Sequence, residues 1–132
     1  MAQLLEEGVS DSWISVTGAK ERSKLERLSQ HQKGEVDYSF ESLATKKATK
    51  HLEPFLVEFH PRERSDLLFT SHEGEEFLFV LEGRVEFRQS DRIEVLGRGD
   101  SIYFNSDIDH SFRSLDKKPA KAVAVVWSKL NG

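Results

Sequence analysis

SHEGEEFLFVLEG, residues 71–83, is the segment that decides the fold class. A histidine and three glutamates precede the apolar run Phe-Leu-Phe-Val-Leu, which ends at Glu82 and Gly83. Aromatic and β-branched residues favour a strand, and a glycine directly after such a run favours a tight turn. The segment therefore predicts a polar turn that leads into a β-strand, with a second turn at its end.

Short β-rich runs of the same kind continue on both sides of this segment, from residue 52 onward. Turn residues separate them at intervals of about 8–12 residues, which is typical of a sandwich or a small barrel. We expect strands over 52–60, 66–72, 76–82, 84–89, 93–96, 101–104, 110–114 and 122–127. The pattern predicts an all-β protein.

The first fifty residues carry a weaker pattern. Residues 34–44 alternate apolar and polar side chains and predict a strand, and residues 13–17 are a second candidate. The composition of 19–28 favours a helix, but its apolar stripe is thin, and a charged edge strand is nearly as good an interpretation. We expect one domain, with an N-terminal extension at 1–33 and a barrel at 34–132.

Composition excludes several classes of function. The chain has 132 residues, a formal net charge of −4 and no cysteine, so we expect no disulfides and no thiolate chemistry. The one basic run, residues 46–50, is short and lacks interleaved aromatics, so we expect no direct binding of nucleic acid. No apolar run approaches the ~18 residues of a membrane span, and the start does not resemble a signal peptide. We expect a cytoplasmic protein without membrane contacts.

His72 and Glu76 are the first candidate metal ligands. In one straight strand these side chains lie about 13 Å apart, too far to share an ion. A turn at Gly74 is expected to let His72 end one strand and Glu76 begin its antiparallel neighbour, where cross-strand partners lie about 4.5–5.5 Å apart. Glu73 and Glu75 are then expected to face water. The local sequence alone favours the alternative, a polar hairpin tip in which His72 only makes a hydrogen bond, because single His-x-x-x-Glu matches are common.

The first cupin motif, H-x-H-x(3,4)-E-x(6)-G, resembles this segment. His72 falls on its second histidine, Glu76 on its glutamate and Gly83 on its glycine. The resemblance implies a double-stranded β-helix, the jelly-roll-like cupin barrel, with metal donors that point inward near one mouth. It covers roughly residues 34–127.

The second cupin motif, G-x(5)-P-x-G-x(2)-H-x(3)-N, resembles residues 99–114. Gly99 and His110 match, and the proline, glycine and asparagine are replaced by Asn105, Asp107 and Ser114. His110 is thereby implied as the third metal ligand.

Thr70 marks the main departure from the family, because cupins with four protein ligands carry a histidine there. The implied site is therefore His72, Glu76 and His110, the set of two histidines and one carboxylate that leaves positions open on a non-haem Fe(II) ion. Imidazole and carboxylate also accept Mn, Ni or Zn. Thr70 is expected to be a weak outer donor or to bind a metal-bound water.

This sequence also resembles two particular groups of cupins, in GEVDYSFESLA (34–44), SHEGEEFLFVLEG (71–83) and GDSIYFNSDIDHSFRS (99–114). One is the cupin half of XRE-type transcriptional regulators, which is thought to sense a small molecule. The residues before position 34 are too few for their helix-turn-helix, so we expect no DNA-binding role. The other is hydroxypropylphosphonate epoxidase, which also has H-x(3)-E followed by EFLFVLEG. Its tyrosine-rich strand near the substrate corresponds to the stretch with Tyr38 and Phe40.

Three hypotheses follow for the function. The first is a metal-binding cupin that holds a small polar or anionic molecule, sensor-like but without a DNA-binding domain. The second is an Fe(II)-dependent oxidoreductase, and the third is a metal-free structural barrel. Expected ligand contacts are Thr70, Tyr38, Phe40 and Tyr103, while catalytic residues remain unassigned. Expected barrel-wall residues are Phe40, Val80, Val85, Phe87, Phe112 and Val125. We also expect a homodimer, since exposed sheet edges need covering.

Overall fold

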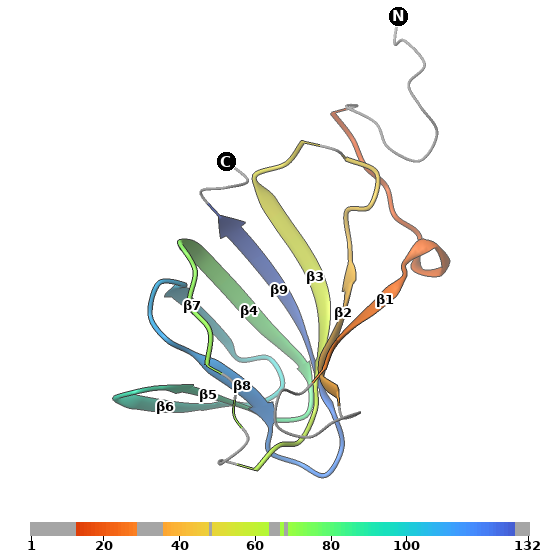
Figure 1. The fold of residues 1–132 in the computed structure, drawn as a ribbon. Helices are drawn as coiled ribbons and strands as arrows, with labels where there is room; N and C mark the ends of the chain where they lie inside the picture. Colours follow the sequence, from red (N-terminus) through yellow and green to blue (C-terminus); the bar gives the residue numbers. More distant parts are fainter. Residues whose placement is uncertain (1–12, 29–35, 48, 64–66, 68, 129–132) are drawn as a thin grey trace, which may run out of the picture.

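The computed structural model describes residues 13–28, 36–47, 49–63, 67 and 69–128. Over these residues the chain forms strands and one short 3-10 turn (Figure 1), which confirms the all-β prediction. The elements are η1 (Ala19–Glu21), β1 (Lys24–Leu28), β2 (Val36–Ser42), β3 (Leu52–Phe59), β4 (Gly74–Glu82), β5 (Val85–Gln89), β6 (Arg92–Leu96), β7 (Ser101–Asn105), β8 (Ser111–Ser114) and β9 (Ala120–Ser128).

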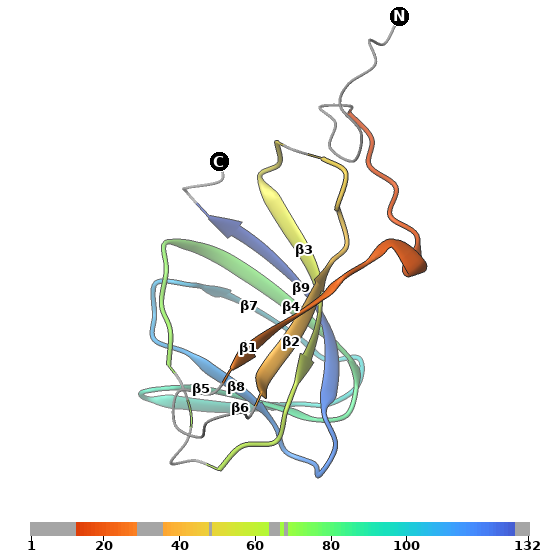
Figure 2. The same cartoon turned by 45° about the vertical axis from the view of Figure 1, so that its right-hand side comes forward.

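The strands form two antiparallel sheets. The larger has the order β1-β2-β3-β9-β4-β7, and the smaller has the order β6-β5-β8. In Figures 1 and 2 the small sheet lies across the end where the strands of the large sheet converge, and these strands fan apart toward the other end. The arrangement is the predicted double-sheet barrel.

The core lies between the two sheets. Because side chains alternate across a strand, every second residue of the long strands points inward. Val80 and Val85 are completely buried, and Val57, Leu78 and Leu96 pack in the same cluster. Burial of this apolar surface is the main force that holds the sheets together.

Two of the strand predictions, those for residues 66–72 and 13–17, are wrong. Residues 66–72 form no strand among their described members: Thr70 makes only an isolated antiparallel bridge to His110. Residues 13–17 have the composition of a strand but pair with no other strand among the described residues. Instead, residues 13–17 contact the loop between β2 and β3, where Lys46 N donates to Ser15 Oγ at 3.3 Å. The side chain of Trp13 is 95% exposed.

The ambiguous stretch 19–28 forms the edge strand rather than a helix. After the 3-10 turn, β1 pairs with β2, and Leu25 lies opposite Phe40 in the register. The segment expected as an N-terminal extension therefore contributes a strand to the large sheet. In the part of the chain that is described, no helix has the length and apolar character needed to cross a membrane.

Candidate metal centre

His72, Glu76 and His110 converge on one point between the sheets. One ligand atom from each lies within 4.8 Å of the others. Glu76 Oε1 lies 3.9 Å from His72 Nε2, and Glu76 Oε2 lies 3.3 Å from His110 Nε2. The three residues that the two sequence motifs single out therefore form one cluster.

The main chain brings these residues together in a way that differs from the expected hairpin. A bend at Glu73 and a φ of 136° at Gly74, a conformation that favours glycine, lead the chain from His72 into β4. However, the neighbours of β4 are β7 and β9, and the segment before it is not a paired strand. The chain therefore bends just before Gly74, which is itself the first residue of β4, and the predicted cross-strand pair between His72 and Glu76 is wrong.

Four main-chain hydrogen bonds join the segment 70–74 to the segment 106–110. Thr70 and His110 each donate an amide to the other's carbonyl at 3.0 Å. His72 N donates to Ser106 O, and Ser106 N donates to Gly74 O, both at 2.9 Å. These bonds hold the two histidine-bearing segments side by side, so the ligand positions depend on the backbone rather than on a hairpin.

The orientation of His110 is fixed by its own loop. Its Nδ1 lies 2.7 Å from the carbonyl oxygen of Ile108. A carbonyl oxygen only accepts, so Nδ1 carries a proton and donates it. In the neutral ring, Nε2 then presents its lone pair to Glu76. Such a carbonyl partner on the far nitrogen is the usual support of a metal-binding histidine.

A cation fits between Nε2 of His110 and Glu76. The Oε2 atom of Glu76 is buried and has no hydrogen-bond partner among the described residues. Two acceptors that face each other at 3.3 Å repel unless a proton or a metal lies between them. With bonds of about 2.0–2.2 Å, two ligands at right angles on one ion lie about 3 Å apart. His72, whose side chain is 39% exposed, has room to adjust toward the same point.

Electrostatics favour a cation at the same place. Burial lowers the pKa of His110, but the adjacent Glu76 carboxylate, the Ile108 carbonyl and the charge of Asp109 outweigh it, so the pKa lies above its ordinary value. This means that the surroundings of Nε2 stabilise positive charge. Without a metal, a proton occupies this position more readily than in an exposed histidine.

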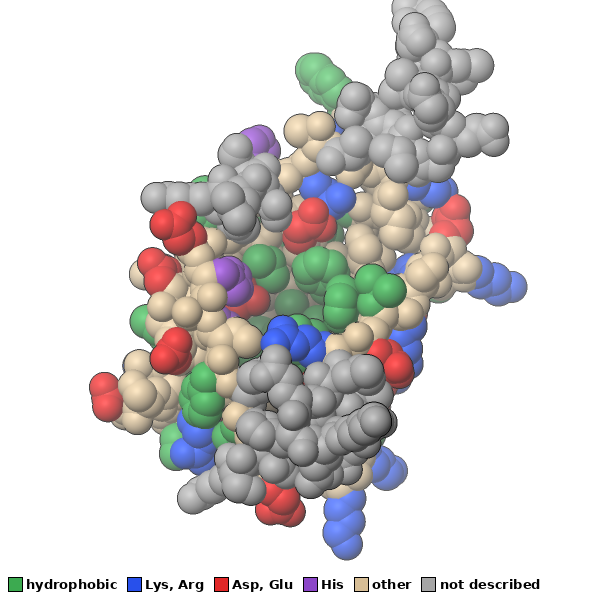
Figure 3. Space-filling view, in the orientation of Figure 1, with side chains coloured by type: hydrophobic (Ala, Val, Ile, Leu, Met, Phe, Trp, Pro, Cys, Tyr) green, Lys and Arg blue, Asp and Glu red, His purple; other side chains and the backbone are tan. Residues whose placement is uncertain are grey.

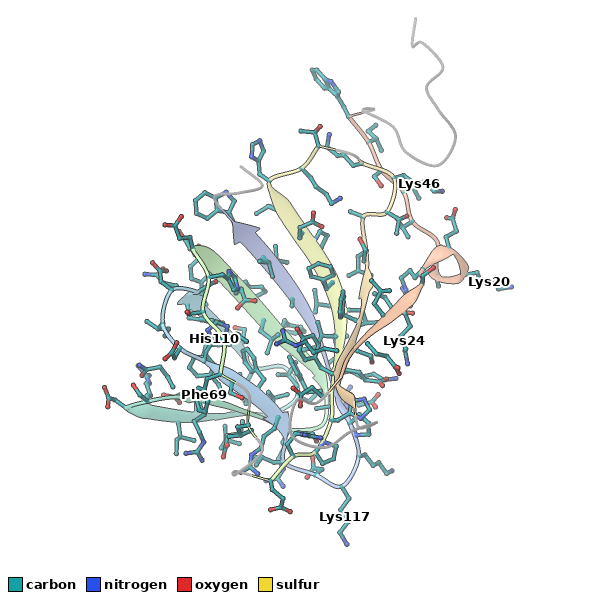
Figure 4. All side chains as sticks on the ribbon, viewed as in Figure 1. Lys20, Lys24, Lys46, Phe69, His110 and Lys117 are labelled. Atoms are coloured by element: carbon teal, nitrogen blue, oxygen red, sulfur yellow. The ribbon has the colours of Figure 1, made fainter. Side chains whose placement is uncertain are left out.

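Aromatic rings surround His110. Phe104 contacts it edge-on with ring centroids 4.8 Å apart, and Phe87 lies parallel at 6.4 Å. Phe112 lies at 6.2 Å. His110 is only 5% exposed (labelled near the start of β8 in Figure 4), so its ring has little freedom to turn away. The packing holds the imidazole of this candidate ligand in one orientation.

The three residues open into a cavity of about 550 Å³. Figure 3 shows a hollow with hydrophobic side chains at its floor, histidine and acidic side chains at one side, and basic side chains near its edge. The lining comprises Arg27, Asp37, Tyr38, Phe40, Phe55, Val57, Phe59, Arg62, Leu67, Thr70, Ser71, His72, Glu76, Phe77, Leu78, Phe104, His110, Ser111, Phe112, Ala124 and Val126. The cavity is large enough for a small organic molecule beside an ion.

Of the expected ligand contacts, three lie on this cavity. Thr70, Tyr38 and Phe40 line it. Tyr103 does not, because it lies on the opposite face of β7 from Phe104, is 65% exposed and donates its hydroxyl to Glu75. Glu75 is therefore a strand residue with a partner rather than a solvated turn residue.

The expected wall residues divide into three groups. Phe40 and Phe112 line the cavity, whereas Val80, Val85 and Phe87 are buried core residues that do not reach it. Val125 is absent from the lining, although its neighbours on β9, Ala124 and Val126, belong to it.

Three charged residues that line the cavity were not predicted from the sequence. Arg27 on the edge strand, Asp37 on β2 and Arg62 after β3 all line it. Arg62 Nε lies 3.2 Å from Asp37 Oδ1, with side chains 5% and 10% exposed. Asp37 gave no signal in the sequence, because it occupies an ordinary polar position between the apolar Val36 and Tyr38.

A buried cluster of charged residues on the small sheet holds the main chain at Arg62 in place. Arg113 binds both carboxylate oxygens of Glu86, at 3.0 and 3.3 Å, and Arg88 Nε donates to Glu86 Oε1 at 3.3 Å. Arg113 Nη1 also donates to the carbonyl oxygen of Arg62 at 2.7 Å. The cluster thereby ties the chain after β3 to β8.

Comparisons with known proteins find a matching sequence family and similar folds. The model of the cupin domain matches residues 55–126. No curated protein sequence matches the chain. Among solved structures, the chain is similar to iron(II)-bound HppE, with a TM-score of 0.76 and 27% identity over 89% of this chain and 62% of that one.

Two further structures give the same result. One is hydroxypropylphosphonic acid epoxidase from S. wedmorenis in complex with fosfomycin, with a TM-score of 0.69 and 30% identity over 85% of this chain and 58% of that one. The other is cobalt(II) HppE in complex with Tris buffer, with a TM-score of 0.60 and 30% identity over 68% and 53%. The chain spans less than two thirds of the length of these proteins.

Proposed function

The chain belongs to the cupin domain family, and on this premise we propose that it binds a divalent metal ion at His72, Glu76 and His110 and uses that ion to hold a small polar or anionic molecule. The observation that carries the proposal is the buried Oε2 of Glu76, which faces a histidine nitrogen without a hydrogen-bond partner among the described residues. A shared cation satisfies both atoms.

Iron(II) is the first choice of metal. Two histidines and one carboxylate are the ligand set of non-haem Fe(II) sites, and similar solved structures hold iron(II) or cobalt(II). Mn, Ni and Zn accept the same donors. When bound, the ion offers open positions to ligand oxygens and acts as a Lewis acid.

The residues of the cavity have three roles in this proposal: they hold the ion, orient the ring of His110 and exclude water. Glu76 and the two histidines hold it, and the Ile108 carbonyl fixes the ring of His110. Phe40, Phe55 and Phe59 form an apolar wall that excludes water from a bound molecule. Thr70 lines the cavity and pairs with His110 through the main chain, which supports the expectation that its hydroxyl donates a hydrogen bond near the ion.

Metal uptake tests this proposal. Metal-free protein is incubated anaerobically with Fe(II), and in parallel with Mn(II), Ni(II) and Zn(II), desalted and analysed for metal content. We expect about one ion per chain for the wild type and a large loss for Glu76→Ala. Glu75→Ala is the matched control, because its carboxylate lies next along β4 and bonds Tyr103. A wild-type protein that takes up none of the four metals contradicts the proposal and leaves the metal-free barrel.

An Fe(II)-dependent oxidoreductase is the second candidate. It is supported by the similarity to iron(II) HppE and to an epoxidase in complex with fosfomycin. Oxygen consumption by the Fe(II)-loaded protein in the presence of candidate substrates, abolished in Glu76→Ala, favours this function. If no substrate is consumed but small molecules still raise the melting temperature, the binding function is preferred. A homodimer and a cytoplasmic location stay predictions.

A further inference from the structure

The cavity has a second charged end, formed by Arg27, Arg62 and Asp37. We propose that this end is an oxyanion subsite, so that the ligand is a short molecule with a carboxylate or similar oxyanion separated by an apolar segment from its metal-binding group. The inference rests on the proposed function, because the other end of the ligand is assigned to the metal ion.

The two arginines are held by different parts of the fold. Arg27 lies opposite Tyr38 in the register of β1 and β2, on the same face of the sheet as Leu25 and Phe40. The register of β1 shifts directly after Arg27, and such irregularities redirect side chains. Arg62 lies beside Asp37 and is 95% buried, which fixes its direction. A planar guanidinium held in this way suits the geometry of an oxyanion.

An apolar stretch separates this end from the metal ligands. Tyr38 contacts Phe59 with ring centroids 6.3 Å apart, Phe59 stacks on Phe112 at 5.0 Å, and Phe112 contacts His110 at 6.2 Å. Three successive ring contacts therefore lie between Tyr38, the register partner of Arg27, and the candidate metal ligand His110. A ligand that reaches both ends needs an apolar middle that lies along these rings.

The charges of the lining favour an anion. Arg27 and Arg62 carry two positive charges, and Asp37 and Glu76 carry two negative ones, so the described lining is neutral without a metal when the histidines are neutral. A divalent ion raises the total to +2. In a cavity with apolar walls this excess is stabilised by a ligand that brings negative charge, most completely by a dianion.

Linear dicarboxylates test the subsite. The wild type, loaded anaerobically with Fe(II), is titrated calorimetrically with malonate, succinate, glutarate and adipate, and with the monocarboxylates of equal length. We expect one dicarboxylate to bind at least about tenfold more tightly than its monocarboxylate, because a hydrogen-bonded charge pair contributes roughly 1.5–3 kcal/mol, a factor of about 10 to 150. Metal content is measured after each titration, since dicarboxylates also chelate free iron.

Variants locate the effect. Arg27→Met is expected to reduce the dicarboxylate advantage to less than about threefold while metal content stays unchanged. Lys24→Met is the matched control: it removes one charge from the same strand, but Lys24 lies on the other face and pairs with Glu58. Arg62→Lys keeps the charge but loses the planar guanidinium, so we expect a smaller difference in affinity between the dicarboxylate and its monocarboxylate. The melting temperature of this variant shows whether it still folds.

The outcomes separate the inference from the function on which it rests. If the wild type takes up no metal, the proposed function fails and the inference fails with it. If metal binds but dicarboxylates have no advantage, or Arg27→Met keeps it, only the oxyanion subsite is wrong. An equal loss in Lys24→Met also overturns it, because the effect is then one of overall charge.

Discussion

Glu86→Gln is expected to be one of the most destabilising single-atom changes in this protein. The Glu86 carboxylate lies on the small sheet with its side chain 7% exposed, between Arg113 at 15% and Arg88 at 18%. Glutamine keeps the shape but removes the charge and one acceptor. Two arginines then remain close together in a poorly solvated position without their counter-ion.

The magnitude follows from this burial. Removing one partner of a fully buried ion pair costs about 3–5 kcal/mol, and the arginines here still reach some water, so we expect a loss of about 2–3 kcal/mol. For a chain of this length, each kcal/mol lowers the melting temperature by about 3–5 °C. The expected decrease is therefore about 10 °C.

The loss has a characteristic pH dependence. Burial raises the pKa of Glu86, but the hydrogen bonds and charges of Arg113 and Arg88 outweigh it and hold the pKa below its ordinary value of 4.5. The ionised carboxylate therefore stabilises the fold fully above pH 4.5. This contribution is lost as the pH falls through the folded-state pKa. Glutamine does not titrate, so the difference between the two proteins is largest at pH 7 and shrinks in acid.

Urea denaturation at pH 7 and at successively lower pH measures this difference. Glu94→Gln is the control, since its ion pair with Arg92 is exposed and we expect a change of less than about 0.5 kcal/mol. The reasoning is refuted if Glu86→Gln costs no more than the control at pH 7. It is also refuted if the deficit at pH 3 equals that at pH 7.

Further predictions concern a turn, the metal and the outer face. Gly83 has a φ of +82°, and in Gly83→Ala the new Cβ lies 3.1 Å from that of Ala120, so we expect a loss of about 2–3 kcal/mol in the free energy of unfolding measured with urea. Gly99→Ala, at a φ of +89° with no atom within 4 Å of the new Cβ, is expected to cost only about 1 kcal/mol of backbone strain, and equal losses contradict the steric argument. A chelator is expected to lower the melting temperature of metal-loaded wild type and to leave that of His110→Gln unchanged. If His110→Gln still gains stability from metal, His110 is not a ligand. Tyr103→Phe should leave metal content unaltered, because it removes only an exposed hydrogen bond.

Most of the fold could be predicted from local sequence. The alternation of apolar and polar residues and the glycines after Glu82 and Leu96 mark β3 to β9 closely, because these strands bury one face. Residues 66–72 have a similar composition, yet the structure uses Thr70 only as a bridge to His110. Composition reports strand preference but not whether a partner strand is within reach.

The site could be predicted only in part. The spacing of His72 and Glu76 was ambiguous locally, and the second motif supplied His110. The way in which they converge could not be predicted, because the hydrogen bond of His72 to Ser106 joins chain segments more than thirty residues apart. Arg27 was hidden for the same reason: only the pairing of β1 with β2 brings it to the cavity.

Among the described residues, the hydrogen bonds that join Thr70 to His110 are main-chain ones, and this bears on what a substitution at position 70 can do. The hydrogen bonds that hold the two histidine-bearing segments together do not involve the side chain at position 70, so a substitution there leaves them in place. Cupins with four protein ligands have a histidine here, and a single substitution in this chain, Thr70→His, recreates that pattern. Under the proposed function, a histidine at position 70 would add a fourth donor and leave one position fewer open on the ion, while the main-chain frame stays the same.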